Sequence, residues 1–362
     1  MIPIARPCVG QEEADAAARV ITSGMLASGL EVTQFEREFA DFTGTSHAVA
    51  TSNGTTALHM ALAALGIRHG DEVIVPSFTF IASATSVSMC GALPVMADIE
   101  ERTYCIDPES VLACITPKTK AVIGVHLFGQ PCDVQALSDI CTDHSLFFIE
   151  DCAQAHGAQY QGKSVGSHGI CGCFSFYPTK NMTCGEGGMV TSDDQELMNR
   201  IRRLINHGQK EKYLHTELGY NFRLTDIAAA IGRVQLRKLP KMNALRQKNA
   251  EVFSKMIYRK GIVTPVVRPG STHVYHQYTI RVSDDADITR DEFIRCLEQK
   301  EIGTAVHYPI PVHKQPVYAS TIHARECPVS EKISREILSI PVHPGLTPAQ
   351  RDEIIQAVNG DI

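Results

Sequence analysis

The chain has 362 residues, of which 44 % are hydrophobic and 20 % are charged. This composition allows a large buried core and excludes a disordered chain. The net charge of −6 argues against a nucleic-acid partner, because such partners are bound by a basic surface. The most apolar stretch, residues 57–67, is too short to cross a bilayer, and the N-terminus lacks the features of a secretory signal. We therefore expect a cytoplasmic protein with no membrane partner.

The first 150 residues alternate between helical and strand patterns. Phe35, Phe39 and Phe42 recur at helical spacing. Thr33 with Glu36 fits a capping box, so we expect this helix to begin near Thr33. Short apolar runs then alternate with helical segments, which is typical of a mostly parallel sheet covered on both faces. We expect strands at residues 47–52, 72–76, 93–98, 121–126 and 146–150, and helices at 55–65, 81–90, 108–114 and 134–143.

The second half of the chain changes character near residue 245. We expect strands at 173–177 and 189–192, helices at 195–207 and 225–239, and a separate long helix at 243–260. Strands at 276–282 and 303–308 with helices at 289–300 and 348–358 then predict a smaller α+β domain. The predicted fold class is α/β. A large domain over residues 1–245 holds a mostly parallel, mixed sheet flanked by helices, and a small C-terminal domain covers 246–362.

The twelve cysteines are scattered through apolar stretches. They predict buried free thiols and not a disulfide framework. Cys171, Cys173 and Cys184 lie close together, but no CxxC pair or histidine-rich knuckle accompanies them. We therefore expect no metal site.

Three motifs fall just beyond predicted strand ends, where α/β sheets hold their ligands. The first is Ser52-Asn53-Gly54-Thr55-Thr56, where a strand ends at a glycine turn and a helix begins. A helix start offers free N–H groups and a positive dipole end, which suit a phosphate. An ordinary Ser/Asn/Thr cap explains the motif equally well when it is taken alone.

The second motif is Glu150-Asp151, a pair of carboxylates that closes an apolar run. A carboxylate at the end of a buried strand is costly unless it faces a cation or several donors. Taken alone, a salt-bridged loop acid is the simpler interpretation.

The third motif runs from Ser175 to Lys180, where a predicted strand leads into a lysine and then a glycine-rich stretch. A lysine in a partly desolvated cleft loses its proton more easily and can form a Schiff base with a carbonyl. Taken alone, a solvated surface lysine is the simpler interpretation.

Together the three motifs are more specific than any one of them. A phosphate cradle, an acid at a strand end and a Schiff-base lysine are the parts needed to hold pyridoxal 5′-phosphate (PLP). Lys180 would form the imine, and Asp151 would keep the pyridine nitrogen protonated so that the ring accepts electrons from a substrate. An ion pair of this kind is strong only where water is excluded.

On these motifs the chain resembles the DegT/DnrJ/StrS-type sugar-nucleotide aminotransferases, which belong to fold-type I of the PLP enzymes. The resemblance covers nearly the whole chain. Some relatives carry histidine in place of the lysine and dehydrate sugars, so Lys180 favours transamination. The matching motifs are Pro76-Ser77-Phe78-Thr79-Phe80, Glu150-Asp151-x-Ala153-Gln154, Ser175-Phe176-x-x-x-Lys180 and Gly219-Tyr220-Asn221-x-Arg223, with residues 52–56 upstream.

The resemblance implies a role for each matching position. Lys180 would carry the imine and move protons, and Asp151 would pair with the pyridine nitrogen. Asn221 would reach the phosphate from the other subunit, which implies a homodimer with shared active sites. Without the rest of the set, Asn221 would be taken as a turn residue and Phe80 as core. The other cofactor contacts would be Gly54, Thr55 and Ser175 at the phosphate, Gln154 near the ring hydroxyl and Phe80 on the ring face.

The substrate end rests on the proline-stiffened loop of residues 304–316. This loop is similar to that of relatives that aminate 3-keto sugars, such as a UDP-linked 2-acetamido-3-keto uronic acid or a dTDP-linked 3-keto-6-deoxyhexose. By resemblance His307 and Tyr308 would line the sugar pocket, and His313 offers a further donor. Arg223 would meet an anionic part of the substrate, because an arginine fork suits a carboxylate or phosphate. A rigid domain crossover is the alternative role for this loop.

The resemblance also implies the reaction. L-glutamate would give its amino group to PLP and leave as 2-oxoglutarate, and the resulting pyridoxamine 5′-phosphate would aminate a keto carbon of a nucleotide-linked sugar. The product would be an aminosugar nucleotide for a surface polysaccharide, a glycan or a secondary metabolite. Two alternatives stay open: a 4-keto sugar-nucleotide aminotransferase of the perosamine type, and a PLP-binding regulator without turnover. A nucleotide-dependent oxidoreductase is disfavoured, because residues 52–56 offer no GxGxxG after the first strand.

Overall fold

A seven-stranded sheet forms the centre of the structure, a computed structural model that describes residues 1–319 and 326–360. The strand order is β1-β9-β8-β5-β4-β2-β3. The five strands from β8 to β3 are parallel, and β9 runs antiparallel to both of its neighbours. The predicted mostly parallel, mixed sheet is therefore confirmed. Its strands are β1 (His47–Thr51), β2 (Glu72–Pro76), β3 (Leu93–Ala97), β4 (Thr119–Val125), β5 (Phe147–Asp151), β8 (Cys171–Ser175) and β9 (Gly188–Ser192).

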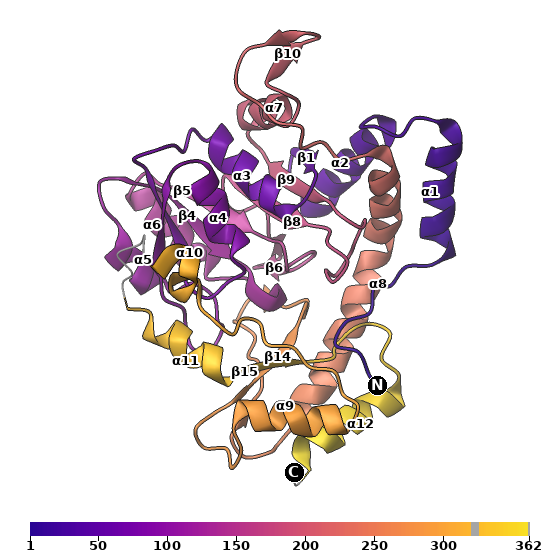
Figure 1. The fold of residues 1–362 in the computed structure, drawn as a ribbon, viewed down its shortest axis with the longest axis vertical. Helices are drawn as coiled ribbons and strands as arrows, with labels where there is room; N and C mark the ends of the chain where they lie inside the picture. The colour runs from indigo at the N-terminus through magenta and orange to yellow at the C-terminus, as the bar shows by residue number, and fades with distance from the viewer. Residues whose placement is uncertain (320–325, 361–362) are drawn as a thin grey trace.

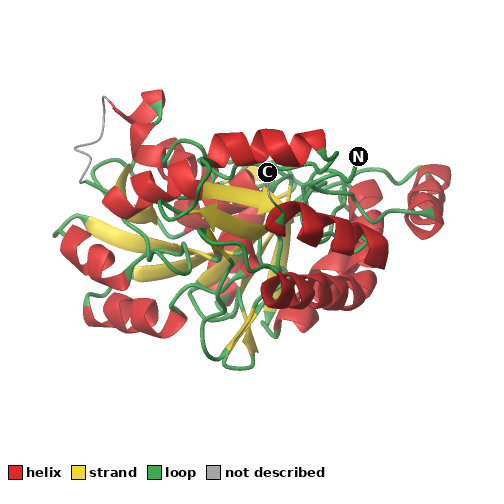
Figure 2. Ribbon diagram, turned by 90° about the horizontal axis from the view of Figure 1, so that it is seen from below, coloured by secondary structure: helices red, strands yellow, loops and turns green. Residues whose placement is uncertain are grey.

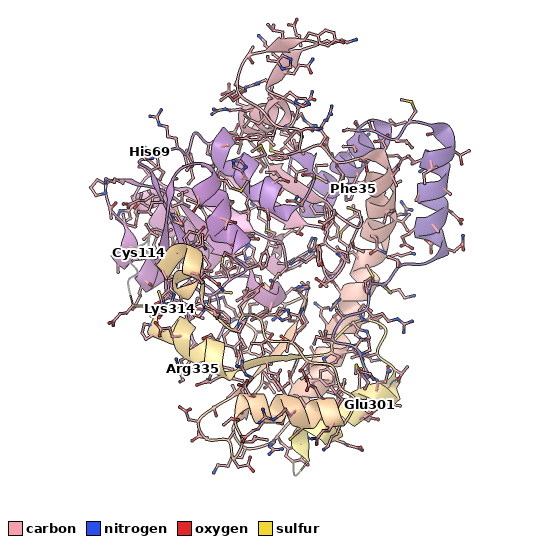
Figure 3. The ribbon with its side chains drawn as sticks, in the orientation of Figure 1. Phe35, His69, Cys114, Glu301, Lys314 and Arg335 are labelled. Atoms are coloured by element: carbon pink, nitrogen blue, oxygen red, sulfur yellow. The ribbon has the colours of Figure 1, made fainter. Side chains whose placement is uncertain are left out.

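Helices cover both faces of this sheet (Figure 2). The side chains of a strand alternate between the two faces, and the core follows that rule. Val49 of β1 belongs to one buried apolar cluster, whereas Ala48 and Ala50 belong to another. Phe35 lies where α2 meets α8 (Figure 3). The helices of this part are α1 (Gln11–Ser23), α2 (Leu30–Thr43), α3 (Gly54–Ala64), α4 (Ala82–Met89), α5 (Pro108–Cys114), α6 (Val134–Asp143) and α7 (Gln195–Leu204).

The long helix α8 (Asp226–Met256) runs from the large sheet down to a second, three-stranded sheet (Figure 1). That antiparallel sheet has the order β12-β14-β15. Its elements are β12 (Ile262–Val263), β14 (Tyr278–Val282) and β15 (Ile337–Ile340), with α9 (Arg290–Gln299) and α12 (Pro348–Asn359) packed nearby. The C-terminal α+β arrangement is therefore present.

Several short elements connect these layers. The hairpin of β10 (Gln209–Glu211) and β11 (Leu214–His215) projects from one end of the molecule (Figure 1). A small sheet joins β13 (Ser271–Thr272) to β6 (Gln159–Tyr160) and β7 (Lys163–Ser164). The remaining elements are the single turns η1 (Leu127–Gly129) and η2 (Val312–Lys314) and the helices α10 (Pro316–Ala319) and α11 (Pro328–Glu336).

The C-terminal segment is not confined to the small sheet. Val312, Tyr318, Cys327 and Ile333 belong to the same buried cluster as the large sheet. Asp98, just after β3, accepts hydrogen bonds from the backbone N–H groups of the first turn of α11. The domain boundary at residue 245 stays a prediction, and these contacts show the C-terminal half packing on both sheets.

Three predictions of local structure are wrong. The helix expected near Thr33 begins at Leu30, and the Thr33 hydroxyl donates to the Gly29 carbonyl instead of capping the helix. The break expected between residues 239 and 243 does not occur, because α8 continues through the exposed Pro240. Residues 303–308 form no strand, and their pairing is limited to a bridge between Ala305 and Ser339.

Within residues 1–319 and 326–360, the helices are all either too short or too polar to span a bilayer.

Candidate active site

The three motifs meet at one edge of the large sheet. β1, β5 and β8 run in the same direction, so their carboxyl ends lie together. The end of β1 leads into α3, β5 ends at Asp151, and β8 ends at Ser175. The sheet topology thus brings the start of α3 next to Asp151 and Ser175, which lie 97 and 121 residues after Gly54 in the sequence.

The start of α3 is shaped to receive a small anion. The Asn53 side chain accepts the Thr56 N–H at 2.9 Å, and the Thr56 hydroxyl accepts the Asn53 N–H at 3.1 Å, which fixes the first turn. A Cβ at Gly54 would lie 2.6 Å from the Cβ of Ser175, so only glycine allows this approach. The first N–H groups of a helix lack intrahelical acceptors and favour a phosphate. The structure therefore brings Gly54 and Thr55 next to Ser175, and their role at a phosphate stays a prediction.

Asp151 is buried, with 5 % of its surface exposed. Its carboxylate accepts the Ser83 hydroxyl at 2.8 Å and the Ala153 N–H at 3.1 Å. Burial raises the pKa of Asp151 above its usual value, although these two donors and the charge of Lys180 act in the opposite direction. Among the described residues, no basic side chain forms an ion pair with it. A buried carboxylate in this state favours a cationic group from a ligand, such as a protonated pyridine nitrogen.

Glu150, the neighbouring carboxylate, serves a different purpose. It accepts His126 Nε2–H at 2.9 Å and the backbone N–H groups of Gly166, His168 and Gly169 at 2.7–2.8 Å. Burial acts to raise the pKa of Glu150, but His126 and the backbone donors hold it below its usual value. Because consecutive strand residues face opposite sides of a sheet, Glu150 is a structural anchor and Asp151 is left open to a ligand.

Of the described residues, His126, Glu150 and Cys152 place their donor atoms within 4.8 Å of one another. The oxygens of Glu150 are already occupied by four hydrogen bonds. His126 Nδ1 accepts the Cys132 N–H at 3.1 Å. The cluster is accounted for as a hydrogen-bond network.

Lys180 follows β8 in a tight turn, with its N–H bonded to the Tyr177 carbonyl at 2.9 Å. Burial lowers its pKa to about 8, and the charge of Asp151 partly offsets the shift. Burial and the charge of Lys180 also lower the pKa of His156 to about 3 and that of His307 to about 4. Lys180 is thus the titratable amine of this edge, surrounded by neutral imidazoles.

Gln154 lies between the large sheet and the loop of residues 304–316. Its Oε1 accepts the Phe128 N–H at 2.7 Å, and its Nε2 donates to the Tyr308 hydroxyl at 2.9 Å. The Tyr308 ring lies 6.1 Å, between centroids, from the rings of both Phe78 and Phe80. Phe80 is 54 % exposed, which suits a ring that is covered by a ligand. The structure thus brings Gln154, Phe80 and Tyr308 together.

His313 does not join this cluster. Its ring is 2 % exposed, its Nδ1 is hydrogen-bonded to the Ser77 hydroxyl, and its Nε2 lies 3.2 Å from Glu331. The Val312 N–H also donates to the Ser77 carbonyl at 2.8 Å. His313 therefore connects the end of β2 to α11 through its two ring nitrogens.

Asn221 and Arg223 lie on an exposed segment after the β10–β11 hairpin. Arg223 donates to the side chains of Asn221 and Asn206, each at 3.1 Å. The Phe222 carbonyl accepts the Ser52 N–H at 2.8 Å, which ties this segment to the residues before α3. Asn221 and Arg223 are therefore hydrogen-bonded to each other, and among the described residues neither is hydrogen-bonded to Lys180.

Sequence reasoning missed two residues of the site. Ser83 donates to Asp151 from the first turn of α4. A signal existed, because Ser83 lies four residues after Thr79 in a motif that was recognised, and the two hydroxyls lie 3.2 Å apart. His126 anchors Glu150, and its place just after an apolar run was its only sequence signal.

These side chains fit PLP. The close approach of Gly54 to Ser175 places the start of α3 beside the Ser175 hydroxyl, the buried Asp151 favours a cation, and the lowered pKa of Lys180 supplies a nucleophilic amine. The protein is a fold-type I, PLP-dependent enzyme.

Comparison with known proteins gives the family. The chain belongs to the DegT/DnrJ/EryC1/StrS aminotransferase family, which it matches over residues 7–359. It is 43 % identical to the dTDP-3-amino-3,4,6-trideoxy-alpha-D-glucose transaminase of Streptomyces venezuelae, over 96 % of this chain and 91 % of that protein. It is 39 % identical to the GDP-perosamine synthase of Caulobacter vibrioides, over 99 % and 97 % of the two chains. The crystal structure of S. venezuelae DesV in complex with a ketimine intermediate superposes with a TM-score of 0.92 at 42 % identity, covering 96 % of this chain and 93 % of that one.

The predicted family, fold class, PLP cofactor and aminotransferase activity are therefore confirmed.

Proposed function

We propose that the protein transfers the amino group of L-glutamate to C3 of a nucleotide-linked 3-keto sugar. The observation that carries the proposal is the placement of Lys180, with its lowered pKa, at the sheet edge that also holds the open carboxylate Asp151. A nucleotide sugar as acceptor is supported by the names of the relatives in S. venezuelae and C. vibrioides. The first of these names a 3-amino sugar and favours C3 over C4.

The residues of the sheet edge would hold the cofactor. Gly54, Thr55 and Ser175 would bind the phosphate, Asp151 the ring nitrogen, Gln154 the ring hydroxyl and Phe80 the ring face. When bound, PLP supplies an aldehyde for the imine and a ring that accepts electrons from the Cα–H bond. Lys180 Nζ would take a proton from the substrate carbon and return it, which its lowered pKa permits near neutral pH.

The loop of residues 304–316 would hold the sugar. Ala305 is bonded to Ser339 through both of its backbone groups, at 2.8 and 3.2 Å, and Val312 is bonded to Ser77 at 2.8 Å. Between these anchors lie His307 and Tyr308, which we propose as sugar contacts. His313 lies beyond the second anchor and would act by holding the loop.

A second copy of the chain would complete the site. The β10–β11 hairpin and the segment after it expose Tyr213 and Leu218 at 82 % and 94 %. Exposed apolar side chains next to a functional segment favour coverage by a partner. We propose a homodimer in which Asn221 reaches the phosphate, and Arg223 the anionic part of the substrate, in the other subunit's site.

Mass spectrometry with ¹⁵N-labelled glutamate tests the proposal. A panel of UDP-, GDP- and dTDP-linked 3-keto and 4-keto sugars would be incubated with the PLP-loaded enzyme. We expect ¹⁵N in the products of 3-keto sugars alone, and bleaching of the visible absorption by glutamate even without sugar. Lys180→Ala should abolish both signals, whereas Lys255→Ala, at an exposed surface pair with Glu251, should keep them.

The outcomes separate the alternatives. Conversion of 4-keto sugars alone would refute C3 and favour the perosamine-type acceptor. A wild-type protein that binds PLP but is not bleached by glutamate would be a regulator without turnover.

A further inference from the structure

We propose that Tyr308 is a positioning residue, which orients the Gln154 amide toward the ring hydroxyl of PLP. This role differs from the sugar contact proposed above and rests on the proposed placement of Gln154 at that hydroxyl. The observation behind it is a continuous chain of hydrogen bonds from the Phe128 backbone through Gln154 to the Tyr308 hydroxyl.

The hydrogen bonds fix which way the Gln154 amide points. The Phe128 N–H can be satisfied only by the amide oxygen, so Oε1 faces η1 and Nε2 faces the opposite side. An amide nitrogen carries two hydrogens, and the Tyr308 hydroxyl accepts one of them at 2.9 Å. We assign the other to the ring hydroxyl. Gln154 is 7 % exposed, so losing a partner would leave a buried polar group underbonded.

The Phe128 end of this chain is rigid. Phe128 and Gly129 both have positive φ, of 58° and 97°. A Cβ at Gly129 would lie 2.9 Å from the backbone nitrogen of His276, so the turn is pressed against the segment after β13. The Gly129 carbonyl accepts the Val274 N–H at 2.9 Å. The acceptor side of Gln154 is therefore held by the backbone.

The Tyr308 end depends on the C-terminal half of the chain. Tyr308 lies between the two anchors of its loop, and its ring packs against Phe78 and Phe80. One side chain thus touches the aromatic residue assigned to the ring face and the amide assigned to the ring edge. Loss of the Tyr308 hydroxyl would therefore release the nitrogen end of the Gln154 amide while the Phe128 N–H still holds its oxygen.

A direct sugar contact and a positioning role predict different measurements. A Tyr308 that only binds sugar would affect the KM for sugar and leave the sugar-free enzyme unchanged. A Tyr308 that positions Gln154 would affect the imine between Lys180 and PLP before any sugar is present. An N–H donor at the ring oxygen stabilises the anion left when the imine loses its proton, so a weaker donor raises the pKa of that imine.

The test is a pH titration of the visible spectrum of the full chain loaded with PLP. Tyr308→Phe keeps the ring contacts and removes the hydroxyl. We expect it to raise the imine pKa by about half a unit or more, the scale of one lost hydrogen bond to a charged form. Gln154→Leu should shift the pKa in the same direction, and the double variant should shift it no further than the larger single change.

Tyr278→Phe is the matched control. Tyr278 is fully buried, and its hydroxyl lies 2.9 Å from that of Ser254, in the small sheet. It should titrate as the wild type, and comparison of its thermal unfolding with that of Tyr308→Phe measures the cost of losing a buried hydroxyl.

The results also separate this inference from the proposed function. A wild-type chain that takes up no PLP would refute both the proposed function and this inference. A wild-type chain that binds PLP but is not bleached by glutamate would refute the proposed function alone, because the titration needs no substrate. A wild type that behaves as expected, with Tyr308→Phe titrating identically or with additive shifts in the double variant, would overturn only the role of Tyr308.

Discussion

The pKa of Lys180 leads to a prediction about how fast the protein without cofactor captures PLP. Imine formation requires the neutral amine, because the protonated form is not a nucleophile. Burial lowers the pKa of Lys180 to about 8, from about 10.4 for an ordinary lysine. The rate of capture should therefore follow the deprotonation of this one residue.

The size of the effect follows from these two pKa values. With a pKa of about 8, roughly 9 % of the amine is neutral at pH 7 and roughly 91 % at pH 9. The rate should rise about tenfold between these pH values and then level off. A lysine with the ordinary pKa would give a rise of about a hundredfold over the same range, with no plateau below pH 10.

Stopped-flow absorbance, with the cofactor-free enzyme mixed with PLP at a series of pH values, measures this rate. A small-molecule amine such as Nα-acetyl-lysine corrects for the titration of PLP itself. Asp151→Asn adds a second check, because the charge of Asp151 raises the pKa of Lys180; the plateau should move to lower pH in this variant. A hundredfold rise without a plateau in the wild type would show that the amine is solvated and that the burial argument is wrong.

Three further predictions concern the residues around Lys180. Asp151→Asn keeps the side-chain shape but removes the charge of a carboxylate that is 5 % exposed. Loss of one partner of a buried ion pair costs about 3–5 kcal/mol, so kcat/KM for transamination should fall by about 10²–10⁴. A fall of less than tenfold would exclude pairing of Asp151 with the ring nitrogen. Gly54→Ala places a Cβ 2.6 Å from that of Ser175. Overpacking of about 1–3 kcal/mol should weaken PLP binding about 5- to 150-fold, as measured by a spectroscopic titration. The control Gly10→Ala, whose added Cβ would have no atom within 4 Å, should bind PLP as the wild type does. Glu150→Gln should lower the free energy of unfolding by about 3–5 kcal/mol at pH 7. Because the pKa of Glu150 is lowered in the fold, the carboxylate stabilises the protein above the unfolded pKa of about 4.3, and this stabilisation is lost as the pH falls through the folded pKa. The free energies of unfolding of wild type and variant, measured by chemical denaturation, should therefore become equal in acid.

The sheet could be predicted from sequence because its signals are local. Apolar runs of about five residues, each followed by a helical segment, gave β2 (Glu72–Pro76) at its observed bounds and most other strands within two residues. The cofactor residues followed from the same pattern, since the ends of parallel strands meet at one edge.

The errors arise where tertiary contacts override local signals. Pro240 normally ends a helix, but buried residues on both sides of it, such as Leu239 and Met242, hold α8 continuous. Residues 303–308 have strand-like composition, yet the loop is held by separate anchors at Ala305 and Val312, and it pairs with β15 only through the bridge between Ala305 and Ser339. His313 has the chemistry of a ligand contact. Its hydrogen bond to Ser77, 236 residues earlier in the sequence, shows that it instead holds the loop.

The pair Glu150-Asp151 shows how the fold turns one motif into two functions. Side chains of consecutive strand residues point to opposite faces of the sheet. Glu150 therefore contacts His126 and three backbone N–H groups, whereas Asp151, on the other face, accepts hydrogen bonds from two donors among the described residues. Glu150 is satisfied as an anion inside the protein, and its pKa is lowered; Asp151 is buried to a similar extent, and its pKa is raised. The charge of Lys180 offsets this rise only in part, and a cation bound next to Asp151 would lower the pKa further. The buried carboxylate of Asp151 thus destabilises the protein without cofactor and stabilises the complex with a protonated ring. The affinity for such a ring therefore follows from the alternation of side chains along β5, which places Asp151 away from the donors that satisfy Glu150.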